Sequence, residues 1–389
     1  DMKLIADMIF NHCGSKHWWM DDLPTDDWLN HNENFRTNYR GSTVVDPHTS
    51  QIDKKHMVEG WFVESMPDLN QNNPFLARYL IQNSIWWIEF AELDGIRMDT
   101  QPYPYKAFMA EWAKTVREEY PDITLLGETW LHFSAFTAYF QGDSPVSGDY
   151  NSYLNSVTDF PLYYATADAF NENEGWKQGM ARLYLQLAQD FLYSDPNSLV
   201  IFPDNHDLNR IFSTFNEDIN KLKMAMGFLL TTRGIPMMYY GTEILMTGYE
   251  HEGHGHIRED FPGGWKEDSR NAFTKEGRTD IENEMYDFIK RLADWRKKNP
   301  ELMHGKLTHF IPENGVYVYF RHTEDDAAMI ILNNNPDEHR TIDLKRFAEI
   351  LKDYKVADNV LNGESVFLED ELWIRKKSVT ILDLEKNKN

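Results

Sequence analysis

The sequence predicts an α/β fold of parallel strands alternating with helices, followed by a smaller antiparallel β-domain. Three short apolar runs each end in acidic or other polar side chains: Leu93–Thr100, Leu125–Glu128 and Leu199–Asp207. Helical segments separate these runs, which is the pattern of parallel β/α units. In a β/α barrel the carboxyl ends of the strands meet at one catalytic face. We therefore expect the carboxylates at these strand ends to gather there.

Composition limits the function. The chain has 389 residues, enough for one barrel-sized domain plus a smaller one. Its 63 acidic residues exceed its 39 basic ones, and the formal charge of -24 would repel a phosphate backbone, so nucleic acid is excluded as a partner. Cys13 is the single cysteine, which excludes an internal disulfide. The sequence contains no run of 18 apolar residues, so we predict no membrane insertion.

The first elements are a strand, a long excursion and a helix. Lys3–Phe10 reads as a buried strand, and residues 13–65 are a stretch rich in Asp, Asn, His and Trp with little periodicity. A helix should begin at Asn73, a capping residue that proline follows. The predicted buried face of this helix holds Leu76, Leu80, Trp87 and Ala91.

The elements that follow continue the β/α alternation and then change character. We predict strands at 123–128, 156–160, 198–202 and 236–240. We predict helices at 105–119, 168–193, 221–232 and 282–298. From Lys306 on, β runs at 315–321, 327–332 and 378–384 indicate an antiparallel domain, with a short helical insertion near 344–351.

The loop at 247–265 carries alternating histidines, His251, His254 and His256. Alternating histidines can indicate a metal site. However, neither Cys nor an ordered set of acids accompanies them at ligand spacing. We therefore predict no metal site in this loop.

Two carboxylates stand out for acid–base chemistry. Arg97 and Asp99 are two residues apart in a predicted strand, so they point to the same face. The guanidinium keeps its proton and favours the ionised form of Asp99, which suits a nucleophile. An ordinary ion pair at a strand end is the alternative, and this segment alone does not decide between them. Glu128 ends an apolar strand beside Trp130, and desolvation there makes it the better candidate for a protonated acid.

Four segments resemble, in order and spacing, the signature regions of the α-amylase family of glycoside hydrolases, glycoside hydrolase family 13. They are D-M-I-F-N-H at 7–12, G-I-R-M-D-T at 95–100, G-E-T-W at 127–130 and F-P-D-N-H-D at 202–207. A fifth segment, M-P-D-L-N at 66–70, resembles the form found in the neopullulanase, cyclomaltodextrinase and maltogenic amylase branch.

The resemblance implies a (β/α)8 TIM barrel, of which this chain holds strands three to eight, followed by a C-terminal antiparallel β-sandwich domain. It implies a catalytic barrel at 1–300 with an inserted small domain at about 13–65, and an all-β domain at 301–389. Because strands one and two would be missing, we expect the working protein to extend before Asp1. The small domain would form one wall of a substrate cleft. Its candidates for sugar contact are His17, Trp18, Trp19, Trp28 and Trp61, although for the tryptophans we favour packing in a small core.

The activity that the resemblance implies is a retaining, endo-acting α-glucan hydrolase that cleaves α-1,4-glucosidic bonds through a covalent glycosyl intermediate. Asp99 would be the nucleophile, Glu128 the acid/base and Asp207 the stabiliser of the transition state. In such an enzyme the carboxyl groups of Asp99 and Glu128 should lie about 5 to 5.5 Å apart.

Substrate contacts implied by the resemblance come from His12, Arg97, His206, Trp130 and Tyr240. The chemistry requires no cofactor, and the resemblance allows a structural calcium ion with Asn11 as a ligand, although this branch often dispenses with that ion. The implied partner is an α-glucan oligosaccharide or polysaccharide. Branch relatives often form a homodimer, and we favour a bacterial periplasmic location over a cytoplasmic one.

At two positions the sequence differs from the pattern of the neopullulanase, cyclomaltodextrinase and maltogenic amylase branch. The substrate could therefore be starch, pullulan, cyclodextrins or maltooligosaccharides. Asn205 stands where the branch commonly has serine, and Leu131 stands where many members have histidine. Two other readings remain. One is a catalytically inactive amylase-like carbohydrate-binding protein, against which the presence of all three acids argues. The other is a different family enzyme, such as an α-glucosidase or a sucrose- or trehalose-type transglycosylase.

Overall fold

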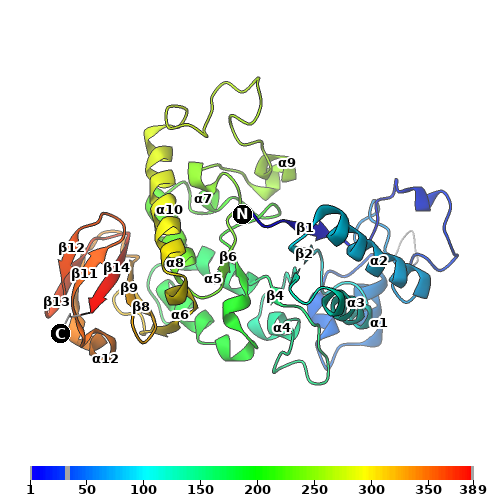
Figure 1. Cartoon of the computed structure of the whole chain (residues 1–389), viewed down its shortest axis with the longest axis horizontal. Helices are drawn as coiled ribbons and strands as arrows, with labels where there is room; N and C mark the ends of the chain where they lie inside the picture. The colour runs from blue at the N-terminus through cyan, green and yellow to red at the C-terminus, as the bar shows by residue number, and fades with distance from the viewer. Residues whose placement is uncertain (1, 31–35, 387–389) are drawn as a thin grey trace. The chain divides into compact units, whose positions relative to one another are not determined.

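The computed structural model describes residues 2–30 and 36–386, and the chain divides into two compact units (Figure 1). Unit 1 comprises residues 1–161 and 189–200, and unit 2 comprises residues 162–188 and 201–389. The chain therefore passes between the units three times. Each unit has a hydrophobic core of its own.

Unit 1 is built on a four-stranded sheet in the order β1-β2-β3-β4. Its strands are β1 (Ile5–Met8), β2 (Gly95–Met98), β3 (Thr124–Gly127) and β4 (Ser156–Val157). All neighbours pair in parallel. Ile96 and Met98 of β2 are fully buried, so the alternation predicted for this strand is confirmed. Asp99 and Glu128 directly follow β2 and β3, and they therefore lie at the same edge of the sheet.

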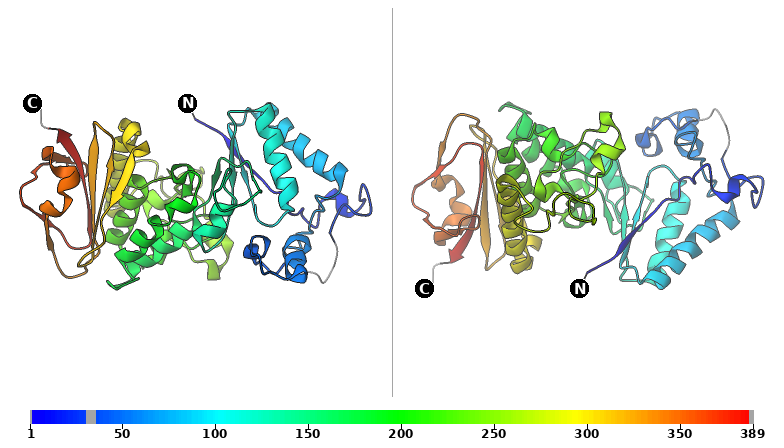
Figure 2. Two further views of the ribbon diagram at one scale, coloured as in Figure 1. Left: turned by 90° about the horizontal axis from the view of Figure 1, so that it is seen from below. Right: turned by 90° about the horizontal axis from the view of Figure 1, so that it is seen from above.

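Two helices pack side by side on one face of this sheet, α2 (Pro74–Ala91) and α3 (Lys106–Glu119) (Figure 2). The predicted start of α2 is confirmed, because the Asn73 side chain accepts hydrogen bonds from two backbone amides of the first turn. The predicted buried face was wrong at Trp87, which is 41% exposed. The buried stripe instead runs through Leu76, Leu80, Ser84 and Ile88.

The excursion at 13–65 is more ordered than its composition suggested. Ser50 caps α1 (Gln51–Glu59), a helix that the sequence analysis did not predict. Trp19 and Trp28 are buried with their ring centroids 5.3 Å apart, so both pack in a core, as we favoured for the tryptophans, but that core is the one of unit 1 and extends beyond the excursion. Trp18, in contrast, is exposed. Unit 1 also contains α4 (Ser134–Tyr139).

In unit 2 the predicted helix at 168–193 is interrupted. It divides into α5 (Phe160–Asn171), which begins in unit 1, and α6 (Met180–Leu187), which follows the positive φ of Gly179. The predicted strand at 236–240 is also shorter, because β6 covers Ile235–Pro236 alone. Two long helices contribute to the core, α8 (Ile219–Thr231) and α10 (Asp280–Lys298). The short elements are β5 (Val200–Ile201), α7 (Ile211–Thr214), α9 (His254–Ile257) and α11 (Pro300–His304).

The C-terminal part of unit 2 is antiparallel, as predicted. A six-stranded sheet has the order β12-β11-β14-β9-β8-β7, and β10 pairs with β13 in a second sheet. The strands are β7 (Lys306–His309), β8 (Val316–His322), β9 (Ala327–Asn333), β10 (Arg340–Asp343), β11 (Tyr354–Asn359), β12 (Ser365–Phe367), β13 (Glu371–Ile374) and β14 (Ser378–Lys386). The predicted helical insertion is confirmed as a 3-10 turn that leads into α12 (Ala348–Leu351).

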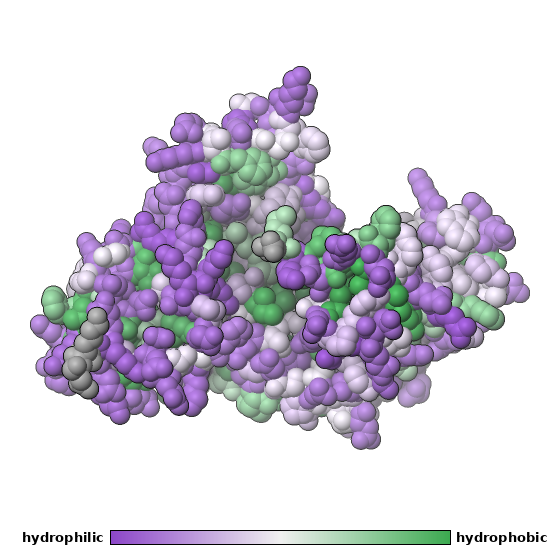
Figure 3. Space-filling model, viewed as in Figure 1, coloured by the Kyte–Doolittle hydropathy of each residue, from purple (hydrophilic) through white to green (hydrophobic). Residues whose placement is uncertain are grey.

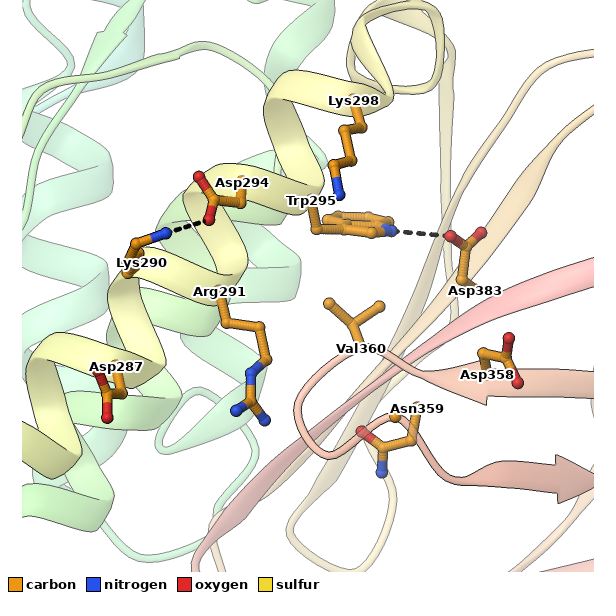
Figure 4. A pocket seen from close by; sticks show the side chains of 11 residues that line it. Asp287, Lys290, Arg291, Asp294, Trp295, Lys298, Asp358, Asn359, Val360 and Asp383 are labelled. Atoms are coloured by element: carbon orange, nitrogen blue, oxygen red, sulfur yellow. Dashed lines mark hydrogen bonds and ion pairs between the residues drawn. The ribbon is translucent and has the colours of Figure 1, made fainter.

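Helices α8 and α10 pack against the six-stranded sheet within unit 2. Thr231 of α8 lies with its hydroxyl 2.5 Å from the hydroxyl of Tyr319, and the Trp295 indole of α10 donates to Asp383 Oδ2 at 2.8 Å. Figure 4 shows this Trp295–Asp383 bond at the rim of a groove of about 600 Å³ between α10 and the sheet. Mixed charges line the groove, and Lys290 pairs with Asp294 on its helical side. The groove is therefore a polar gap between helix and sheet.

Hydrophilic residues predominate on the face drawn in Figure 3, with hydrophobic areas between them. The outer side of α2 contributes exposed aromatic side chains, among them Trp86 and Phe90, whose rings stack with centroids 4.7 Å apart. Within residues 2–30 and 36–386, none of the helices combines the length and the apolar character that crossing a bilayer requires.

Candidate active site

Arg97 is the centre of the candidate site in unit 1. Its Nη1 donates to both oxygens of Asp7, at 2.7 and 2.8 Å, and to Asp99 Oδ1 at 3.1 Å. Its Nη2 donates to Glu128 Oε1 at 2.5 Å. Burial alone would lower the pKa of Arg97, but the charges of Glu128, Asp7 and Asp99 outweigh burial and raise it. The guanidinium thus stays charged and holds three carboxylates around one point.

The strand ends fix these carboxylates through the backbone. Asp99 donates its amide hydrogen to Met8 O, and Glu128 donates its own to Met98 O. Thr100 has a positive φ of 48°, and its amide donates to Glu128 Oε2 at 3.0 Å. Both oxygens of Glu128 therefore accept hydrogen bonds, one from a side chain and one from the backbone. A left-handed threonine at this turn is a conformation that surrounding contacts must stabilise.

The contacts of Arg97 differ from those predicted from the sequence. We expected Arg97 to single out Asp99 for the ionised role, but the same guanidinium also pairs with Glu128, at a shorter distance. Burial is what separates the two acids. The Glu128 side chain is 6% exposed and that of Asp99 is 19% exposed. Glu128 is the better shielded from water, which is the environment of a general acid.

His12 follows β1 and lies on the same side of the sheet as Asp99 and Glu128. Burial lowers the pKa of His12, and the charge of Asp99 partly offsets this. The His12 ring lies 5.6 Å from that of Phe62, which in turn lies 5.3 Å from Tyr103. Burial is also the main cause that raises the pKa of Tyr103, followed by the charge of Glu128. A neutral histidine and a neutral tyrosine therefore border the carboxylates.

Trp130 is the other predicted contact in unit 1. Its ring stacks on Phe160, with centroids 4.9 Å apart and an interplanar angle of 12°. The side chain nevertheless remains 40% exposed. Part of this aromatic surface is thus open to solvent two residues after Glu128.

Asp207 and His206 lie in unit 2, where they form a second cluster. His206 Nε2 is 3.1 Å from Asp207 Oδ2, and Arg258 Nη2 donates to Asp207 Oδ1 at 2.6 Å. Arg258 Nε also donates to the carbonyl oxygen of His206 at 2.8 Å. His254, which the sequence analysis weighed as a metal ligand, lies 3.7 Å from Asp207. Whether Asp207 meets Asp99 and Glu128 stays a prediction.

Tyr240 lies beyond the short strand β6, also in unit 2. Its hydroxyl donates to Glu259 O at 2.8 Å, and its carbonyl accepts from the buried guanidinium of Arg210. Arg210 also stacks on the Tyr239 ring, 4.0 Å from its centroid. The predicted contact residue is therefore held at both its backbone and its hydroxyl.

The buried oxygen of Asn11 bears on the calcium expectation. Among the described residues, Asn11 Oδ1 has no hydrogen-bond partner, and neither does Oδ1 of the buried Asp68 on a neighbouring segment. Burial raises the pKa of Asp68 well above its usual value. Two such hard oxygen atoms fit the ligand preference of Ca²⁺. Over residues 2–30 and 36–386, no group of three or more His, Cys, Asp or Glu side chains gathers as a metal site.

Two charged residues of these clusters, Asp7 and Arg258, were not among the predicted site residues. Asp7 begins the D-M-I-F-N-H segment, but it meets Arg97 through the register of β1 with β2. Neither strand by itself contains that register. Arg258 gave no comparable signal, since it is 51 residues from Asp207 in an irregular loop.

Comparisons with known proteins identify the family of this chain. The family pattern described as "Alpha amylase, catalytic domain" matches residues 1–305, and the one described as "Cyclo-malto-dextrinase C-terminal domain" matches residues 307–383. A solved Anoxybacillus α-amylase matches with a TM-score of 0.80 at 27% identity, covering 100% of this chain and 77% of that one. An α-amylase of Geobacillus thermoleovorans, solved with acarbose, matches with a TM-score of 0.79 at 28% identity, covering 100% and 78%.

The curated relatives are much longer than this chain. The "Beta/alpha-amylase" of Paenibacillus polymyxa is 25% identical, over 98% of this chain and 28% of its own length. The cyclomaltodextrinase of Thermoanaerobacter pseudethanolicus is 24% identical, over 86% of this chain and 52% of its own. The chain thus spans about half or less of these relatives. The predicted fold class is confirmed: a TIM-barrel catalytic domain precedes a C-terminal antiparallel β-sheet domain.

Proposed function

Because this chain belongs to the α-amylase family of glycoside hydrolases, we propose that it is a retaining, endo-acting α-glucan hydrolase that cleaves α-1,4-glucosidic bonds. One observation carries the proposal. Asp99 and Glu128 follow adjacent parallel strands and touch neighbouring nitrogens of one guanidinium, so two carboxyl groups flank a single small volume. A retaining glycosidase needs such a pair.

In the first step, Asp99 attacks the anomeric carbon and Glu128 gives its proton to the glycosidic oxygen. The bond from the anomeric carbon to the leaving sugar breaks as the bond to Asp99 Oδ forms, and the leaving sugar departs with a new hydroxyl. Arg97 holds Asp99 in place through the 3.1 Å hydrogen bond, so the nucleophile is ionised and oriented before substrate arrives. Glu128 must release an accepted hydrogen bond, such as that from Arg97 or Thr100, to present its proton to the sugar.

In the second step, Glu128 takes a proton from water, and the resulting hydroxide attacks the anomeric carbon of the glycosyl ester. The ester bond breaks, Asp99 regains its charge, and Glu128 is protonated again. Two inversions at one carbon give net retention. The burial of Glu128 serves both steps, because a shielded carboxyl can hold and then regain a proton near neutral pH.

The remaining predicted residues bind the sugar. His12 and His206 donate hydrogen bonds to its hydroxyls, Asp207 accepts them and favours the distorted ring, and Trp130 and Tyr240 offer aromatic faces. Arg258 holds the Asp207 side chain in place for this task through the 2.6 Å bond. A calcium ion, where bound, would take oxygen ligands from Asn11 and Asp68 and stabilise the fold around His12. A homodimer stays a prediction.

Starch, pullulan, cyclodextrins and maltooligosaccharides are the substrates that we propose. The Geobacillus relative was solved with acarbose, and the match to a cyclomaltodextrinase C-terminal domain favours cyclodextrins among the four. Asn205 and Leu131 are the two residues that differ from the branch pattern. They adjoin His206 and Trp130 in the sequence and would influence which of the four substrates is preferred.

Reducing-sugar release from the four substrates tests the proposal. We expect activity in the wild type, a loss of at least about 1,000-fold in Asp99→Asn and in Glu128→Gln, and retention of the anomeric configuration by NMR. The exposed Asp122→Asn removes the same charge and should leave the rates unchanged. If wild type and Asp99→Asn were equally inert while both bound maltooligosaccharide, the protein would be a carbohydrate-binding relative instead.

A further inference from the structure

Three carboxylates share one guanidinium in unit 1, and the proposed mechanism uses two of them. The third, Asp7, is bound through both of its oxygens, which accept from Arg97 Nη1. Its side chain is 47% exposed, whereas the two catalytic acids are largely buried. Asp7 therefore has contact with the site but no assigned task in it.

The contact between Arg97 and Glu128 poses a problem for a general acid. A guanidinium at 2.5 Å favours the ionised form of a carboxyl, and an ionised Glu128 has no proton to give. Asp7 opposes this effect because it places a negative charge on the opposite amino group of the same guanidinium. With Asp99 also ionised, Asp7 makes the surroundings of Glu128 net negative, and a further ionised carboxyl there is disfavoured.

We propose that Asp7 is a positioning residue that offsets the charge of Arg97, so that Glu128 can hold its proton at the pH where Asp99 is ionised. The inference rests on the proposed function and deepens it. Asp7 acts through Arg97 and does not touch the reacting atoms. Its register position opposite Arg97 in the parallel sheet keeps this contact fixed.

Other charged or titratable groups also lie near the cluster. They include His12, Asp99, Tyr103, Tyr39 and Arg40, from the segments after β1 and β2 and from the excursion. His12 has a lowered pKa and Tyr103 a raised one, so both stay neutral in the working range. Arg40 acts on the Tyr103 ring and adds positive charge. Asp7 is thus the acid outside the catalytic pair that touches Arg97 within the described residues.

The pH dependence of kcat/KM tests this role. The basic limb of that profile reports the loss of the proton from the general acid. In Asp7→Asn the charge of Arg97 is no longer offset, the ionised form of Glu128 gains stability, and the basic limb should move to lower pH by roughly one unit. Asp7→Glu restores the charge and should return the limb toward the wild-type position.

Asp94→Asn is the matched control. Asp94 immediately precedes β2 and pairs with Lys3 at 2.6 Å, so this variant removes one paired negative charge from the same two strands at their other end. It should leave the basic limb where it is. Asp7→Ser is a second neutral variant, to be compared in the same way.

The outcomes separate the inference from the proposed function. An inactive wild type overturns the proposed function and this inference with it. An active wild type whose neutral Asp7 variants lose rate equally at every pH, with an unmoved basic limb, overturns the inference alone and makes Asp7 a structural residue. A limb that moves in the neutral variants and returns in Asp7→Glu supports it.

Discussion

Asp204 offers a prediction about pH and stability that does not depend on catalysis. It is fully buried in unit 2, its Oδ2 accepts from the amide of Ile211 at 2.8 Å, and within the described chain its Oδ1 has no hydrogen-bond partner. Burial raises the pKa of Asp204 to about 7, against the opposing effects of the Ile211 amide, the charge of Arg210 and the side chain of Thr242. The perturbation that we choose is Asp204→Asn, which keeps the shape and cannot ionise.

The direction in which stability changes with pH follows from the number of protons that the folded and unfolded states bind. An acid whose pKa is higher in the folded state binds more protons when folded, so stability falls as pH rises from the unfolded pKa to the folded one. For Asp204 the decline begins near the ordinary value of 3.8 and ends at about 7. The full slope inside that window is about 1.4 kcal/mol per pH unit, and it falls to half of that at the folded pKa, so the loss between pH 5 and pH 7 is about 2 kcal/mol.

Melting temperature measures this loss. The melting temperature of Asp204→Asn minus that of the wild type should rise by roughly 4–8 °C between pH 5 and pH 7, because a unit of this size shifts by about 2–4 °C per kcal/mol. The exposed Asp337→Asn is the control and should show a difference that does not change with pH. A constant difference for Asp204→Asn as well would refute the reasoning, since Asp204 would then titrate outside this window.

Three further predictions concern single contacts. Asn73→Ala removes the cap that bonds two amides of α2 and should destabilise unit 1 by about 1 kcal/mol, as measured by urea unfolding; an unchanged midpoint would contradict the cap. Gly227→Val in α8 would bring a Cβ within 2.8 Å of Val379 in β14 and should cost about 1–3 kcal/mol, whereas an unaltered melting temperature would show that helix and strand separate easily. Chelation with EDTA should lower the melting temperature of the wild type but not of Asn11→Ala if calcium binds Asn11 and Asp68; an equal response of both proteins would remove that ion from the proposal.

The sequence by itself determined the local features of the catalytic edge. Alternation along β2 placed Ile96 and Met98 inward and Arg97 and Asp99 on the other face, because the side-chain period of a strand is a property of the backbone. The start of α2 at Asn73 was equally local, since a cap needs its own helix and nothing else. Short motifs at strand ends also carried the family resemblance, which the match over residues 1–305 confirmed.

Only the tertiary structure decided which charged side chains form hydrogen bonds with one another. The sharing of Arg97 among three acids depends on the register of strands whose residues lie 31 to 90 positions apart, and neither the alternation nor the motif of one strand contains that register. For the same reason the sequence could not place Trp87, which is exposed although its helix period suggested burial. Arg258 reached Asp207 from an irregular loop, where no periodicity relates one side chain to another. Short local sequence motifs thus identified the residues that can act in catalysis. The charged groups that surround each of these residues come from distant segments that folding brings together.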